Sequence, residues 1–187
     1  MAVLFKNISF GYERKIFDDF NYHFNRETIS CIYGLNGTGK STLIAMLAGL
    51  IKPQKGEIVI EKGMKTGFVL QFPENLVYTD SVYNEIFSIV KSSEITENII
   101  KTLNLDEVRD INPFKLSDGQ KRVMFICSIL MCNDLCIFDE PFTSIDKETK
   151  KNIKEMFSNF KNKKKTIIYT TNRKFDTDIA DFVLELK

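Results

Sequence analysis

The sequence contains no tryptophan, a single histidine and only four cysteines in 187 residues. The cysteines are Cys31, Cys127, Cys132 and Cys136, and none of them forms a C-x-x-C pair. Two of them, Cys31 and Cys136, lie inside apolar, strand-like segments and are expected to behave as small core residues. A disulfide framework is therefore not indicated, and a reducing compartment fits these cysteines better.

Long hydrophobic runs are also absent. The longest apolar stretch begins at Val123 and stops at Asn133, which is short of the ~18 residues that a membrane span needs. The first residues are strand-like, with no basic segment followed by an apolar one, so a signal peptide is not expected. We therefore predict a cytoplasmic protein, and any attachment to the inner face of the cell membrane has to come through partner subunits.

Neither sign of charge dominates. The 26 Lys and Arg residues nearly balance the 25 Asp and Glu residues, which gives a net charge of +1. Bulk attraction to nucleic acid is not expected from this balance, so no nucleic-acid partner is predicted. The composition is 43% hydrophobic and 27% charged, as in ordinary globular proteins, and the length suits one domain.

Strand-like and helix-like segments alternate along the chain, which predicts an α/β fold with a mainly parallel core sheet. A small helical subdomain is expected to be inserted at about 79–132, within one domain spanning 1–187. The N-terminal segments 3–10 and 17–24 read as a separate β part. The other expected strands are 28–33, 56–60, 66–70, 135–138, 166–169 and 182–184, and the expected helices outside 79–112 are 41–50, 120–132 and 146–160.

The segment from Gly34 to Ser41 (GLNGTGKS) matches the phosphate-binding pattern G-x-x-x-x-G-K-[ST] in full. Its glycines let successive backbone N–H groups point at phosphate, and the following helix presents its positive end to the same anion. Lys40 should reach the β- and γ-phosphates, and the Ser41 hydroxyl should bind Mg²⁺. The residues predicted to bind ATP here are Gly34, Leu35, Asn36, Gly37, Thr38, Gly39, Lys40, Ser41 and Thr42.

A second motif, which is acidic, stands about a hundred residues after the phosphate loop. It is the end of the apolar segment 135–138, which is followed by Asp139 and Glu140. We expect Asp139 to hold Mg²⁺, directly or through water. Glu140 is expected to accept a proton from, or to orient, the water that attacks the γ-phosphate. Alone, an apolar run that ends in two acids is weak evidence, but after a phosphate loop it is strong evidence for a nucleoside triphosphatase.

Between these two motifs lies the pentapeptide LSDGQ, at 116–120. With all three motifs in this order, the chain resembles the ATP-binding subunits of ATP-binding cassette (ABC) transporters, a type of P-loop NTPase, over nearly its whole length. The resemblance implies that Tyr12 stacks on adenine and that Gln71 contacts Mg²⁺ and the attacking water. Segment 144–146 resembles the loop that crosses the dimer interface in this family.

The resemblance also implies a head-to-tail dimer with a second ABC ATPase subunit, which is either another copy or a relative. Ser117 and the Gly119 backbone of one subunit would bind the γ-phosphate held by the other. ATP would close the dimer, and integral membrane transporter subunits would convert the motion into transport. The strings QFPEN at 71–75 and NPFKLS at 112–117 are similar to those of energy-coupling-factor transporters, while an ordinary ABC importer or exporter is the alternative.

Two positions depart from the family pattern. The family has a histidine after the last core strand that contacts the γ-phosphate, and Thr171 occupies that position here. The single histidine, His23, lies in an early strand and is expected to be structural. The pentapeptide at 116–120 resembles the family's signature, LSGGQ, and Asp118 stands where the signature has its first glycine, so it adds a negative charge near the predicted γ-phosphate position.

Two interpretations of these departures stay open at this point: a compact but fully active subunit, or a subunit with weakened sites that depends on a partner ATPase. Thr171 is counted with Glu140 and Gln71 as a candidate catalytic residue. The main functional prediction is an ATP-hydrolysing transporter subunit that uses ATP and Mg²⁺. The alternative is a soluble or regulatory ABC ATPase with weak hydrolysis.

Overall fold

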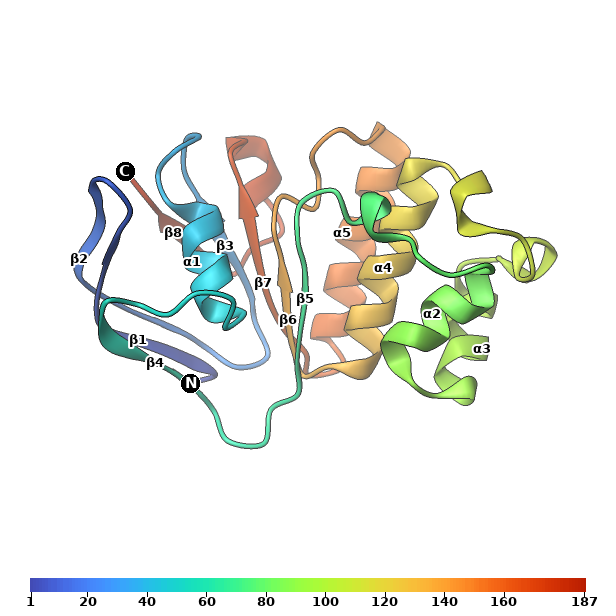
Figure 1. Ribbon diagram of the computed structural model, residues 1–187, viewed down its shortest axis with the longest axis horizontal. Helices are drawn as coiled ribbons and strands as arrows, with labels where there is room; N and C mark the ends of the chain where they lie inside the picture. Colours follow the sequence, from blue (N-terminus) through green and yellow to red (C-terminus); the bar gives the residue numbers. More distant parts are fainter.

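Five parallel strands form the central sheet of the computed structural model, which describes residues 1–187 (Figure 1). Their spatial order is β5-β6-β7-β3-β8. The bounds are Ile29–Tyr33 for β3, Thr66–Val69 for β5, Leu135–Phe138 for β6, Thr166–Thr171 for β7 and Phe182–Glu185 for β8. Strands β6 and β7 are buried at every position, as expected for parallel strands that are covered on both faces. The predicted parallel core sheet is confirmed.

A second, antiparallel sheet is built from the N-terminal part of the chain. Its order is β2-β1-β4, with β1 at Val3–Gly11, β2 at Lys15–Phe24 and β4 at Lys55–Ile60. Helix α1 (Lys40–Leu47) lies between this sheet and the central one (Figure 1). One cluster of 16 buried side chains joins the three layers, so the helix that follows the phosphate loop is held from both sides.

Helices cover the other face of the central sheet. α4 (Asp118–Cys132) contacts β5 and β6, and α5 (Lys147–Lys161) contacts β3 and β7. Beyond α4 lie α2 (Val82–Val90) and α3 (Ser93–Thr102), which form the small helical part of the molecule (Figure 1). A cluster of 11 buried side chains packs α2, α3 and α4 together. The remaining elements are single 3-10 turns at Pro73–Leu76 (η1), Asp106–Val108 (η2), Pro113–Lys115 (η3) and Lys174–Thr177 (η4).

All five parallel strands point the same way, so their carboxyl ends meet at one edge of the sheet, the upper edge in Figure 1. The phosphate loop follows β3, Gln71 follows β5, and Asp139 and Glu140 follow β6. Ligands of open α/β sheets bind outside this edge. The topology therefore gathers motifs that are far apart in the sequence.

Several element boundaries differ from the sequence-based prediction by one to three residues, and three of these differences bear on the site. β7 continues to Thr171, two residues beyond the expected end, because its side chains remain buried to that point. β5 ends at Val69, so Gln71 lies in the loop after the strand. Helix α4 begins at Asp118 rather than at 120, since Ser117 caps it. No helix of the molecule combines the length and the apolar character that crossing a bilayer requires.

Candidate functional site

The phosphate loop depends on two glycines with left-handed backbone conformations. Gly37 has a φ of 86° and Gly39 a φ of 94°, values that other residues rarely adopt. A Cβ atom at Gly39 would also come within 2.6 Å of Ile16 Cγ2. The loop can therefore curl tightly against β2, and α1 begins directly at Lys40 with its free N–H groups facing the loop.

Lys40 is buried and held inside this loop. Its Nζ donates hydrogen bonds to the carbonyl oxygens of Gly34, at 2.9 Å, and Leu35, at 3.1 Å. The same Nζ lies 3.7 Å from Glu140 Oε1. The ammonium group therefore stands between the phosphate loop and the carboxylate that follows β6, where it can neutralise phosphate charge.

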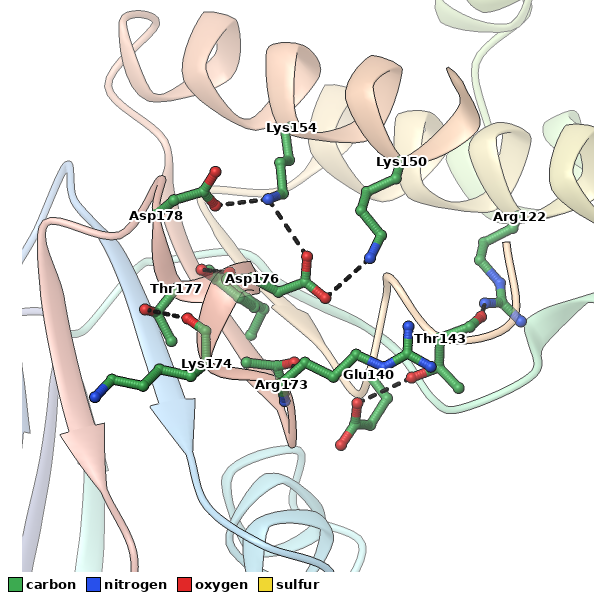
Figure 2. Close-up of polar contacts among 12 residues, drawn as sticks. Arg122, Glu140, Thr143, Lys150, Lys154, Arg173, Lys174, Asp176, Thr177 and Asp178 are labelled. Carbon is green, nitrogen blue, oxygen red and sulfur yellow. Dashed lines mark hydrogen bonds and ion pairs between the residues drawn. The ribbon is translucent and has the colours of Figure 1, made fainter. Parts of the chain in front are cut away.

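Glu140 occupies a conformation that its neighbours fix. Its φ of 49° lies in the left-handed region, which costs energy for a residue with a side chain and persists where the surroundings enforce it. Its N–H donates to Thr170 Oγ1 at 2.8 Å, and Thr143 Oγ1 donates to Glu140 Oε2 at 3.0 Å (Figure 2). The carboxylate is oriented from the sheet and from its own loop, as a general base requires.

Asp139 is the first residue after β6 and directly precedes Glu140. Its carboxylate is buried, and Oδ1 accepts a 2.6 Å hydrogen bond from Thr170 Oγ1. The Thr170 hydroxyl therefore connects the Asp139 side chain with the Glu140 backbone. This places the two acids in one hydrogen-bonded unit at the end of β6.

A cavity of about 550 Å³ brings together half of the predicted site residues, and its size is common for small-molecule sites. Ile16 is the one hydrophobic side chain in its lining. Eight lining residues were predicted from the sequence: Asn36, Gly37, Gly39, Lys40, Ser41, Thr42, Gln71 and Glu140. Thr143 and Asn172 line it as well and were missed. The only signal for them in the sequence was a weak one: each lies within three residues of a predicted position.

Other predicted residues lie away from this lining. Gly34, Leu35 and Thr38 belong to the loop but not to the cavity lining, and Asp139 is not part of the lining either. The Tyr12 ring is 70% exposed and makes an edge contact with Phe10 at 5.1 Å between centroids. An exposed ring can stack on a base, so that role stays a prediction.

Thr171 points into the protein. It is 1% exposed, and its Oγ1 accepts a hydrogen bond from the Arg173 N–H at 3.1 Å. Its position as the last residue of β7 explains this orientation, because every side chain of that strand is buried. Asn172, the next residue, lines the cavity instead.

Ser117 and Gly119 line a different cavity, of about 720 Å³, between α3, α4 and α5. Ser117 Oγ accepts from the Gln120 N–H at 3.2 Å, and Gln120 Oε1 accepts from the Ser117 N–H at 2.9 Å, which is a complete capping box. The first turn of α4 is therefore rigid, and it does not reach the phosphate loop of its own chain.

The Asp118 carboxylate is turned outward and paired. It is exposed and lies 2.7 Å from Lys121 Nζ, one turn further along α4. The hydrogen bond and the positive charge of Lys121 lower the pKa of Asp118 below its ordinary value. The negative charge that replaces the expected glycine is thus largely compensated by its neighbour in the helix.

Arg122 connects the start of α4 to the loops around Glu140. Its guanidinium binds Glu74 of η1 with two hydrogen bonds, of 3.2 Å and 2.5 Å. It donates a third to the carbonyl oxygen of Thr143, which lies beside it in Figure 2. Both side chains of the ion pair are buried. Sequence reasoning missed this pair, because its members are 48 residues apart.

A phosphate loop with a buried lysine, facing an oriented glutamate at the carboxyl edge of a parallel sheet, defines a P-loop nucleoside triphosphatase. The family model described as "ABC transporter" matches residues 17–143, more than half of the chain. The chain therefore belongs to the ABC transporter family and is an ATP-binding subunit of that family.

Individual relatives agree with this assignment. The energy-coupling factor transporter ATP-binding protein EcfA1 of Fusobacterium nucleatum is 32% identical over 203 residues, which cover 97% of this chain and 77% of that protein. EcfA2 of Streptococcus agalactiae is 29% identical over 220 residues, covering 100% and 78%. The solved structure of cbiO1 from Clostridium perfringens, part of the ABC transporter complex cbiONQ, shares the fold, with a TM-score of 0.87 at 24% identity over 100% of this chain and 84% of that chain.

Proposed function

We propose that this chain hydrolyses Mg-ATP in a head-to-tail dimer and that integral membrane subunits of the energy-coupling-factor type convert the dimer's motion into transport. The observation that carries the proposal is the separation of two half-sites. Lys40, Ser41 and Glu140 line one cavity, while Ser117 and Gly119 line another. A nucleotide can meet both sets only if a second subunit supplies one of them.

Within the cavity of about 550 Å³ beside the phosphate loop, we assign the chemistry as follows. Lys40 and the loop N–H groups bind the phosphates, and Glu140 orients the attacking water. Mg²⁺ supplies charge neutralisation at the phosphates when it is bound, and Ser41, Gln71 and Asp139 would hold it. The chain has no group of three or more His, Cys, Asp or Glu side chains arranged for a metal. Mg²⁺ suits such a site, since it is usually held by one or two carboxylates together with phosphate oxygens and water.

The transporter assignment is supported by the QFPEN and NPFKLS segments and by relatives named as energy-coupling factor subunits. It implies a subunit attached to the inner face of the cell membrane through its partners. The test is to tag the chain at low level in its native cell, solubilise the membranes gently and identify the proteins that co-purify. An integral membrane protein is expected, and recovery from the soluble fraction alone contradicts the proposal.

The dimer has its own test. Lys40→Ala removes the phosphate-loop lysine, and Ser117→Arg blocks the half-site that serves the other subunit. Each variant alone should be inactive. A mixed dimer of the two has one site with an intact loop and an intact signature, so an equal mixture should regain up to about a quarter of the parental ATPase rate. No recovery, from a parent that is active by itself, contradicts the head-to-tail arrangement.

Weak hydrolysis is the alternative function, and the buried Thr171 favours it, since that position adds no donor to the cavity. The fixed Glu140 carboxylate opposes it. Single-turnover measurement of ATP hydrolysis by the purified dimer separates the two. If Glu140→Gln does not lower this rate of hydrolysis, the chain is a subunit that binds ATP without hydrolysing it.

A further inference from the structure

A cavity at the start of α5 is lined mainly by cations. It has a volume of about 480 Å³ and is bordered by α5, by the loop before α5 and by the chain after β7. This volume falls within the range of small-molecule sites. We call this cavity the lysine pocket. Its cations are Lys147, Lys150, Lys151, Lys154 and Arg173, and its single anion is Glu155.

Four of these cations share one face of α5. Lys147, Lys150, Lys151 and Lys154 are spaced i, i+3, i+4 and i+7 along the helix, which places them on the same side. Like charges at this spacing repel each other and destabilise a helix. The sequence therefore gathers positive charge here against the preference of the helix itself, and an anion bound in the pocket would relieve the repulsion.

Two of the lysines are held in place by the protein. Asp176 of η4 is fully buried and lies 3.1 Å from Lys150 Nζ and 3.3 Å from Lys154 Nζ (Figure 2). The two lysine side chains are only 17% and 16% exposed, unlike a lysine row that extends into water. Lys150 Nζ also lies 4.8 Å from the centre of the Phe175 ring, which is itself exposed. The pocket thus combines cations of fixed position with one accessible aromatic ring.

Two other cations of the pocket have no partner in the chain. Lys147 and Arg173 are exposed, and neither side chain forms an ion pair or a hydrogen bond. The one acid of the lining, Glu155, is already paired with Lys151 at 3.6 Å. Guanidinium and ammonium groups are the side-chain groups that most often bind phosphate. The unpaired charge of the pocket is therefore available to an anion that comes from outside the chain.

The lysine pocket borders the ATP site without being part of it. Thr143 and Asn172 line the cavity beside the phosphate loop, whereas Ile145 and Arg173 line the lysine pocket. The two cavities have no lining residue in common, but the same two chain segments border both. An anion bound to Arg173 would thus be held by the residue that directly follows Asn172.

We propose that the lysine pocket is a second anion site, which takes the phosphate groups of a small phosphate-bearing molecule. Lys147 and Arg173 bind the phosphate oxygens, and Lys150 adds positive charge beside them. A polyvalent phosphate fits better than a single carboxylate, because one carboxylate cannot neutralise several cations. Two sources share this chemistry: a polyphosphate without a ring, and a nucleotide whose base stacks on Phe175. The site goes beyond the proposed ATP site and does not depend on hydrolysis.

The test measures the binding of pyrophosphate by isothermal titration calorimetry in protein saturated with ADP, so that the phosphate loop is filled. Lys147→Ala combined with Arg173→Ala should weaken this binding at least about tenfold, because two charge-assisted contacts are lost. Lys62→Ala combined with Lys101→Ala removes two exposed cations elsewhere on the surface. This control should change the binding by less than about twofold, because distant exposed charges are screened by salt.

Phe175→Ala distinguishes the two sources of phosphate. If the ligand is a nucleotide, a second ADP binds to each chain and Phe175→Ala weakens it, while pyrophosphate binding changes by less than about twofold. If the ligand has no ring, pyrophosphate binds to the pocket and a second ADP does not.

Two results would overturn the inference. One is that ADP-saturated protein binds no pyrophosphate. The other is that the binding survives the Lys147 and Arg173 substitutions and is lost in Lys40→Ala, which would place the anion in the phosphate loop. A parent that binds no ADP refutes the proposed ATP site alone, because the pocket variants still report on the binding of pyrophosphate.

Discussion

The buried ion pair between Arg122 and Glu74 allows a quantitative prediction, since the chain contains a similar pair at its surface. Arg109 and Glu97 also share two hydrogen bonds, of 3.2 Å and 2.8 Å. Their side chains are 35% and 38% exposed, against 3% and 9% for Arg122 and Glu74. The two pairs thus have the same chemistry and the same number of mutual hydrogen bonds, and they differ mainly in burial.

Arg122→Met removes three hydrogen bonds and leaves the Glu74 carboxylate buried without a cation. Breaking a buried pair in this way costs about 3–5 kcal/mol, which is a large share of the roughly 5–15 kcal/mol that holds a protein folded. Arg109→Met should cost less than about 1 kcal/mol, because exposed pairs are screened by water. The double variant Arg122→Met with Glu74→Leu removes both charges, so it should recover most of the loss.

Urea unfolding followed by far-UV circular dichroism measures these differences, since the chain has no tryptophan for fluorescence. If Arg122→Met and Arg109→Met destabilise the protein equally, burial does not set the strength of these pairs and the reasoning is refuted. If the double variant is as unstable as Arg122→Met, the loss comes from the Thr143 carbonyl or from packing, and not from the stranded carboxylate.

Two further predictions concern charge. Asp118→Gly should change the ATPase rate by no more than roughly twofold, because Lys121 already compensates the exposed carboxylate; a steady-state rate more than tenfold higher would show that this charge repels phosphate. Burial raises the pKa of the Cys31, Cys127 and Cys136 thiols to about 12. The unfolded chain loses these protons above about pH 9 while the native state keeps them, so stability should fall by about 1.4 kcal/mol per pH unit for each thiol above that pH. Cys136→Ala should reduce this slope in urea titrations, and a flat profile from pH 8 to 10.5 contradicts the assignment.

Local sequence was sufficient for the parts of the site that are contiguous in the chain. The phosphate loop and the Asp139–Glu140 pair are each read from fewer than ten residues, and the apolar runs beside them predict the parallel strands. The capping box of Ser117 and Gln120 is equally local, although the sequence-based prediction did not use it and placed the start of α4 at 120. These features need no knowledge of the tertiary structure, because local hydrogen bonds and side-chain alternation determine them.

Side-chain direction at the end of a strand could not be read in the same way. The sequence placed Thr171 as a candidate contact because it follows the expected last strand, but β7 runs two residues further. The strand end decides which residue turns toward the cavity, and here Thr171 is buried while Asn172, one residue later, lines the cavity. The ion pair between Glu74 and Arg122 could not be predicted from the sequence either, because the packing of two distant segments brings these residues together.

The same distant contact explains how the two half-sites of one chain can be connected. Arg122 lies five residues after Ser117 on a helix whose first turn is fixed by a capping box. Its guanidinium binds the carbonyl of Thr143, whose hydroxyl holds Glu140, and it binds Glu74, three residues after Gln71. A displacement of α4 on contact with a nucleotide in the other subunit must therefore either move both loops or break buried hydrogen bonds. Glu140, which we propose to orient water in one site, and Ser117, which we propose to contact phosphate in the other, are thus joined by only two intervening side chains, those of Arg122 and Thr143.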